Sequence, residues 1–161
     1  MNAPILTETE LRRVVQDERE KKRTIAFANG VFDVLHVGHV RYLQEASKEA
    51  DVLIVGVNSD DSVRAIKGPA RPVVNERERA ELISAIRGVS FVIIFNDASP
   101  ARLIAALQPD VHCKGTDYTA DSVPEAEIVR AYGGRVAIVG DPKDHSTTDM
   151  LQRMKTMNDE G

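Results

Sequence analysis

The sequence has little cysteine, no excess of positive charge and no long apolar run. Its single cysteine, Cys113, can form no disulfide within the chain, which indicates a reducing compartment. The 21 Lys and Arg against 25 Asp and Glu give a net charge of −4, which argues against a general binder of nucleic acid or anionic membranes. No stretch approaches the ~18 apolar residues of a membrane span, and the first residues lack a secretory signal pattern. We therefore expect a cytoplasmic protein with no nucleic-acid and no membrane partner.

Internal repeats and low-complexity segments are also missing, so the 161 residues are expected to form one main domain. Apolar residues make up 42% and charged residues 29%, as in ordinary globular proteins. Thr7 and Glu10 form a capping-box pattern that begins an N-terminal helix. We expect an N-terminal helix and arm over residues 1–23, the main domain over 24–157 and a short tail over 158–161.

Five short runs are apolar throughout instead of alternating with polar residues, which is typical of strands covered on both faces of a parallel sheet. Helical patterns alternate with them, and Ser99-Pro100 predicts an N-cap followed by a first-turn proline. The pattern predicts an α/β fold, a doubly wound (Rossmann-like) five-stranded parallel sheet with helices on both faces. Such sheets bind ligands beyond the carboxyl ends of their strands. The expected strands are 24–28, 52–57, 91–95, 111–114 and 136–139; the expected helices after the first are 38–49, 76–87, 101–107, 124–132 and 146–157.

The first predicted strand leads directly into N-G-V-F-D-V-L-H-V-G-H-V, residues 29–40. His36 and His39 are three residues apart, so both can face one side of the first turn of the helix that follows. Gly38 lets an anion approach the backbone, and Asp33 is an acceptor in the same turn. Helix N-termini attract phosphate, so paired imidazoles here predict a site for a phosphate that gains charge.

Two other interpretations of these residues stay open. The histidines could be incidental surface groups, or they could join His112 or Cys113 in a zinc site. Structural zinc usually takes four ligands, often including a C-x-x-C pair, which one cysteine cannot supply. We expect Cys113 to be a core residue, because nothing near it in the sequence indicates an activated thiol.

The H-V-G-H segment after N-G-V-F-D resembles the HxGH signature of the nucleotidyltransferase superfamily, in its cytidylyltransferase-like branch. Other segments resemble the family in the same order, and the likeness runs from about residue 25 to residue 154. The combination of R-P-V, K-G-x-D-Y and S-T-T is most similar to the heptose 1-phosphate adenylyltransferases, in a stand-alone form. The segments are V-N-S-D (57–60), K-G-P-A-R-P-V (67–73), E-R-A-E-L (78–82), C-K-G-T-D-Y (113–118) and H-S-T-T-D-M-L (145–151).

This resemblance implies an enzyme that transfers AMP from ATP to a sugar 1-phosphate and releases pyrophosphate, making ADP-heptose for lipopolysaccharide. Glycerol-3-phosphate cytidylyltransferases, which use CTP, share part of the motif set and are the alternative. A nucleotide-binding regulatory module without turnover is a further alternative. The family also implies Mg²⁺ with the nucleotide and a homo-oligomer, commonly a dimer. No carboxylate cluster forms a metal cage, so we expect no dedicated protein ligand, with Asp33 the protein group nearest to Mg²⁺.

The resemblance also assigns roles to individual residues. It implies that His36, His39, Lys67 and Arg79 are catalytic, with Lys67 in a loop and Arg79 holding phosphate through its two-pronged guanidinium. The start of the last helix is expected both to cap that helix and to bind phosphate. The implied nucleotide-binding residues are Asn29, Gly30, Phe32, Asp33, Gly38, Arg71, Lys114, Asp117, Ser146, Thr147 and Thr148.

Overall fold

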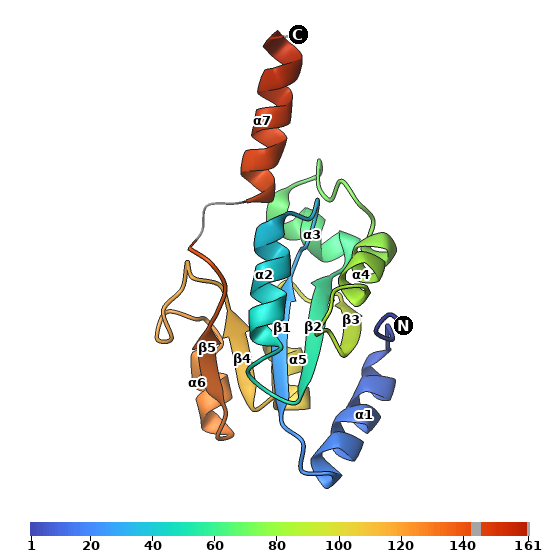
Figure 1. The fold of residues 1–161 in the computed structure, drawn as a ribbon, viewed down its shortest axis with the longest axis vertical. Coiled ribbons are helices and arrows are strands. Elements are labelled where there is room, and N and C mark those ends of the chain that lie inside the picture. Colours follow the sequence, from blue (N-terminus) through green and yellow to red (C-terminus); the bar gives the residue numbers. More distant parts are fainter. Residues whose placement is uncertain (143–145, 161) are drawn as a thin grey trace.

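The computed structural model describes residues 1–142 and 146–160. Its centre is a five-stranded, all-parallel sheet of order β3-β2-β1-β4-β5 (Figure 1), which confirms the predicted fold class. Both β3 and β4 begin and end where the sequence predicts, and the other strands differ by one or two residues at an end. The strands are β1 (Ile25–Gly30), β2 (Val52–Asn58), β3 (Phe91–Phe95), β4 (Val111–Lys114) and β5 (Arg135–Ile138).

Each face of the sheet packs on its own helices, because successive strand residues point to opposite sides. In β1, Ala26 and Ala28 join the core formed with α2 (Val37–Ala46) and α4 (Glu76–Ser84). The intervening Ile25 and Phe27 join the core on the other side. This second core is closed by α1 (Glu8–Glu20), α5 (Ala101–Leu107) and α6 (Ala126–Ala131).

One helix was not predicted from the sequence. Residues 60–67 form α3 (Asp60–Lys67), which Ser59 caps by accepting a bond from the Ser62 amide at 3.2 Å. The sequence pattern is weak because this short, polar helix buries few side chains. Lys67 is therefore the last residue of a helix and not, as predicted, part of a loop.

Several helix ends differ from the predicted ones. The helix α2 ends at Ala46 and α4 at Ser84, about one turn before the predicted ends, whereas α7 (Thr147–Glu160) continues past residue 157. Pro100 takes the N-cap position of α5, and the Ser99 hydroxyl instead accepts a bond from the Ala101 amide at 3.2 Å. Helix ends are set by tertiary contacts as much as by local sequence, which explains these shifts.

The N-terminal arm lies along the free edge of β3. The Leu6 amide donates to the Val92 carbonyl at 2.8 Å, and the Val92 amide donates to the Pro4 carbonyl at 3.0 Å. Thr7 and Glu10 form the predicted capping box at the start of α1. The arm thus covers part of a sheet edge that would otherwise expose unpaired backbone groups.

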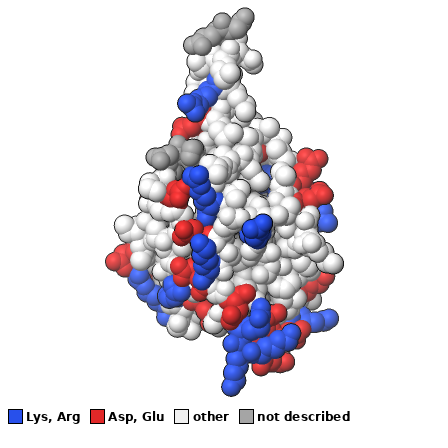
Figure 2. Space-filling view, in the orientation of Figure 1, with Lys and Arg blue, Asp and Glu red and all other residues white. Residues whose placement is uncertain are grey.

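Charged side chains of both signs are interspersed on the face of the molecule seen in Figure 2. The C-terminal helix α7 projects from the body at the end opposite to α1 (Figure 1). Within the described part of the chain, none of the helices has the length and apolar character that a membrane crossing requires.

Candidate active site

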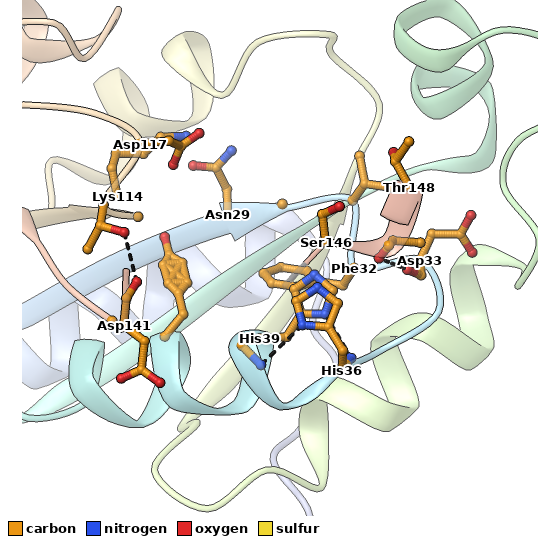
Figure 3. A pocket seen from close by; sticks show the side chains of 18 of the residues that line it. Asn29, Phe32, Asp33, His36, His39, Lys114, Asp117, Asp141, Ser146 and Thr148 are labelled. Carbon is orange, nitrogen blue, oxygen red and sulfur yellow. Dashed lines mark hydrogen bonds between the residues drawn. The ribbon is translucent and has the colours of Figure 1, made fainter. Parts of the chain in front are cut away.

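A cavity of about 470 Å³ lies beyond the carboxyl ends of β1 and β4. The chain leaves β1 toward β2 on one side and returns to β4 on the other, so this is the switch point of the sheet, where doubly wound folds bind ligands. Every residue predicted for the site lines this cavity except Arg79. In Figure 3 the labelled residues form two groups, one around Lys114 and Asp117 and one around the two histidines.

The turn between β1 and α2 has a strained backbone. Phe32 and Val34 have φ values of 52° and 49°, which side chains other than glycine rarely adopt. The Thr147 hydroxyl, at the start of α7, donates to the carbonyls of Asp33 at 2.6 Å and Val34 at 3.1 Å. The first turn of α7 therefore holds this turn in place, although the two are far apart in the sequence.

Phe32 is 5% exposed, and its ring packs inside the turn. A Cβ at Gly30 would lie 3.0 Å from this ring, so Gly30 leaves room for it. The ring meets His39 edge-on, with the centroids 5.6 Å apart. Phe32 thus supports a histidine as well as lining the cavity.

The two histidines are stacked, with ring centroids 3.9 Å apart and planes 24° apart. The Nδ1 atom of His36 accepts from the Gly38 amide at 3.1 Å, and Nδ1 of His39 accepts from the His36 amide at 3.2 Å. In the neutral rings these bonds place the proton on Nε2, so each ring is a donor through that atom. Burial and the neighbouring His36 lower the pKa of His39 to about 4, so His39 is neutral at physiological pH.

The Gly38 amide, which we expected to face an anion, is used by His36 as the cap of α2. Gly38 therefore fixes His36 through its amide while it also lines the cavity. Its expected contact with an anion stays a prediction.

Asp33 anchors a loop, and its side chain is fully buried. Its carboxylate accepts from Arg71 Nε at 2.7 Å and from the amides of Val73 and Val74 at 2.8 and 2.9 Å. Burial alone would raise the pKa of Asp33, but these bonds outweigh it and lower that pKa. Both oxygens are already occupied by donors, so Asp33 is poorly suited to hold Mg²⁺ directly. Arg71 reaches the cavity from this loop, and the exposed Lys67 reaches it from the end of α3.

At the other end of the cavity, Lys114 ends β4 and its ammonium lies 5.0 Å from the centre of the Tyr118 ring. Burial lowers the pKa of Lys114, whereas the charges of Glu125 and Asp117 oppose that change. The Oδ1 atom of Asn29 is buried and has no hydrogen-bond partner among residues 1–142 and 146–160. A ligand donor that reaches Asn29 would satisfy this acceptor.

Ser146 performs the predicted capping role at the start of α7, since its hydroxyl accepts from the Asp149 amide at 3.0 Å. Thr147 is committed to the β1–α2 turn, and the exposed Thr148 lines the cavity. His145, the first residue of the resembling segment, lies outside the described residues.

Arg79 is the predicted residue that the structure does not bring to the cavity. It is 0% exposed, and its guanidinium donates to the carbonyls of Val74, Val31 and Asn58 and to the Asp60 carboxylate, over 2.6 to 2.9 Å. Four of its five N–H donors are thus used inside the protein. We replace the predicted phosphate contact with a structural role, in which Arg79 joins the ends of β1 and β2 to α4.

Sequence reasoning missed several lining residues. Tyr42 comes from α2 and donates its hydroxyl to the Cys113 carbonyl at 2.7 Å, while Gly140 and Asp141 follow β5. Thr116, in the K-G-T-D-Y segment, donates to the Asp141 carbonyl at 2.7 Å. The signal for the residues after β5 was their position in the chain. The loops after β4 and β5 both begin at the carboxyl edge of the sheet, where such folds bind ligands.

The zinc interpretation finds no support in the part of the chain that is described, where no group of three His, Cys, Asp or Glu is placed to hold a metal. Cys113 is buried in the core as predicted, and burial raises the pKa of its thiol to about 12. The thiol of Cys113 is therefore an unreactive part of the core.

Comparison with known proteins gives the family. The cytidylyltransferase-like family model matches residues 27–159, which include both histidines and the start of α7. This chain belongs to the cytidylyltransferase-like family. The resemblance to nucleotidyltransferases drawn from the sequence is thereby confirmed.

Relatives of this cytidylyltransferase-like chain include the "Bifunctional protein HldE" of Syntrophotalea carbinolica, 42% identical over 94% of this chain and 31% of the relative. The protein of the same name from Hyphomonas neptunium is 49% identical over 82% of this chain and 27% of its own length. The chain therefore spans less than a third of these relatives.

Solved structures share this fold. The lipopolysaccharide core biosynthesis protein of Thermoplasma volcanium is 31% identical, with a TM-score of 0.59 over 73% of this chain and 94% of its own. Pantothenate synthetase of Thermus thermophilus is 21% identical, with a TM-score of 0.57 over 89% of this chain and 63% of its own, and shares the fold.

Proposed function

We propose that this chain transfers AMP from ATP to the phosphate of a heptose 1-phosphate, giving ADP-heptose and pyrophosphate. One observation carries the proposal. In a cytidylyltransferase-like chain similar to HldE proteins, two stacked imidazoles, Lys114 and the start of α7 line one cavity at the switch point of the sheet. We place the reaction in the cytoplasm, where ATP is available.

In this reaction a phosphate oxygen of the sugar attacks the α-phosphorus of ATP, and the bond to pyrophosphate breaks. The chain needs no covalent intermediate, so its task is to align the reactants and to stabilise charge. The Nε2–H groups of His36 and His39 donate to phosphate oxygens that gain charge. Lys114, together with Arg71 and Lys67 around the cavity, adds positive charge. Thr148 and Ser146 bind the phosphates that leave.

Mg²⁺ would neutralise charge on the triphosphate. The residues around the cavity fit an ion held by phosphates and waters, because the Asp33 carboxylate already accepts from Arg71 and two amides. We propose no protein carboxylate as a direct ligand.

Release of pyrophosphate tests the proposal, using ATP or CTP with heptose 1-phosphate or glycerol 3-phosphate and Mg²⁺. We expect release with ATP and heptose 1-phosphate. Release confined to CTP and glycerol 3-phosphate would instead support the alternative enzyme, and no release with any pair would support a nucleotide-binding module. The homodimer implied by the family also stays a prediction, and light scattering should give twice the 17.7 kDa of the chain.

A further inference from the structure

A buried pair of ionisable side chains lies behind Lys114, and the proposed reaction does not use it. His112 of β4 is 0% exposed and Glu125, the residue before α6, is 5% exposed. The two are joined by His112 Nε2 and Glu125 Oε2 at 3.3 Å. A core built only for stability would place apolar side chains here, because burying ionisable groups is costly.

The imidazole bonds to the carboxylate through only one of its two ring nitrogens. His112 stacks on Phe27, with centroids 6.0 Å apart and planes 29° apart. Its Nδ1 atom has no hydrogen-bond partner among the described residues, so a proton there would be a buried donor without an acceptor. A carboxylate only accepts, so His112 donates to Glu125 through Nε2. This bond, helped by the charge of Lys114, lowers the pKa of Glu125 although burial opposes the change, so Glu125 keeps its negative charge.

Lys114 carries an opposite charge that interacts with this carboxylate. It is two residues from His112 on the same strand, so both side chains leave the same face of the sheet. Glu125 acts on Lys114 from the N-cap position of α6, and Asp117 and Tyr118 act on it from the loop after β4. Across the strand, Tyr42 of α2 donates to the Cys113 carbonyl. Of the two carboxylates, Asp117 lines the cavity, whereas Glu125 is buried away from a ligand.

We propose that Glu125, oriented by His112, is a positioning residue whose fixed charge keeps Lys114 charged at the cavity. This inference rests on the proposed function only in taking the anion at Lys114 to be a nucleotide phosphate. Desolvation of Lys114 opposes its charged form, and a fixed buried carboxylate offsets that cost whether or not ligand is bound.

The test is the titration of Lys114 in the intact chain without nucleotide, followed by ¹³C NMR of lysine Cε and assigned with Lys114→Arg. Glu125→Gln should lower the pKa of Lys114 by about 1 unit or more, as loss of a nearby opposite charge does. Glu127→Gln is the matched control, because Glu127 is an exposed carboxylate two residues after Glu125, in the first turn of α6. An unchanged Lys114 titration in Glu125→Gln would overturn the proposal.

Binding of ATP gives a second readout. The alkaline loss of ATP affinity should begin at lower pH in Glu125→Gln than in the wild type or Glu127→Gln. In a Lys114→Met background, Glu125→Gln should cause no further change in this pH dependence.

If Glu125→Gln fails to fold, His112→Phe keeps the stacked ring and removes the bond to Glu125. A smaller decrease in the pKa of Lys114 is expected in this variant. An unshifted Lys114 in a folded His112→Phe would refute the role of His112. Because the NMR titration needs no turnover, it can succeed even if no nucleotidyl transfer is found.

Discussion

Backbone amides fix the protons of the two histidines in the β1–α2 turn. Each Nδ1 accepts a backbone amide, which fixes both rings and makes Nε2 the donor. Two Nε2–H donors that are held before the reaction starts need no reorganisation as charge develops on phosphate. Their value should therefore be greater in the transition state than in the bound nucleotide.

Replacing His39 by Ala tests this difference. We expect kcat to fall by about 10²–10³, as for other single donors aimed at developing charge, while KM for ATP changes much less. Steady-state kinetics with pyrophosphate detection gives both constants. Glu45→Gln, an exposed change on α2, is the control and should match the wild type. A loss confined to KM would contradict the role of His39.

Burial of His39 also makes the stability of the protein depend on pH. Its pKa is about 4 in the folded chain and about 6.5 when exposed, so between these values the unfolded chain binds more protons. The free energy of unfolding should fall as pH drops from 6.5 to 4. Urea midpoints measured across this range should be less pH-dependent in His39→Gln, and an unchanged slope would argue against a buried neutral ring.

Arg79 shows how a residue can be important without touching a ligand. Arg79→Met should lower the free energy of unfolding by roughly 3–5 kcal/mol, because it leaves backbone carbonyls without their donor and removes the buried cation that pairs with the partly exposed Asp60. Arg77→Met, at an exposed site on the same helix, should change it little. Urea unfolding of both variants measures the difference. Equal stability of the two would return Arg79 to its predicted role at the phosphate.

At the scale of elements, the site depends on segments that are tied together across the fold. The loop over residues 68–75 is held to the β1–α2 turn by Asp33, and the same turn is held by Thr147 from α7. The segments that line the cavity are therefore linked by side-chain bonds to backbone as well as by packing.

Asp33→Asn should loosen this loop. An amide can keep some of the contacts but loses the charge that pairs with Arg71. Hydrogen exchange at the amides of Val73 and Val74 should become faster, and KM for ATP should rise. Asp61→Asn is a suitable control because its carboxylate is 77% exposed on α3. Unchanged protection of the two amides would show that the anchor is unimportant.

At the scale of the whole molecule, the cavity is shaped by parts of the chain from residue 29 to residue 148. A ligand that binds there should stabilise the entire domain, because it binds only the folded chain. We expect ATP with Mg²⁺ to raise the melting temperature more than CTP does. At 100 times its Kd a ligand adds ~2.7 kcal/mol, which a thermal melt detects. A larger effect of CTP would favour the cytidylyltransferase alternative.

The sequence alone determined the sheet and the place of the site. Uninterrupted apolar runs predicted buried parallel strands, and H-V-G-H after the first strand marked the edge where the cavity lies. These features are local: a strand needs its own apolar residues, and a turn needs its own glycine and polar groups. The short helix α3 was not predicted, because its few buried residues leave little periodic pattern in the sequence.

Only the tertiary structure decided which polar groups face the cavity and which are used inside the protein. Arg79 and Arg71 are alike in the sequence, yet one is enclosed by carbonyls and the other pairs with Asp33 at the cavity. The pairing of His112 with Glu125 is likewise invisible in the sequence, because it joins β4 to the start of α6. Hydrogen bonding depends on distance and direction in space, and residues far apart along the chain acquire these only when the fold brings them together.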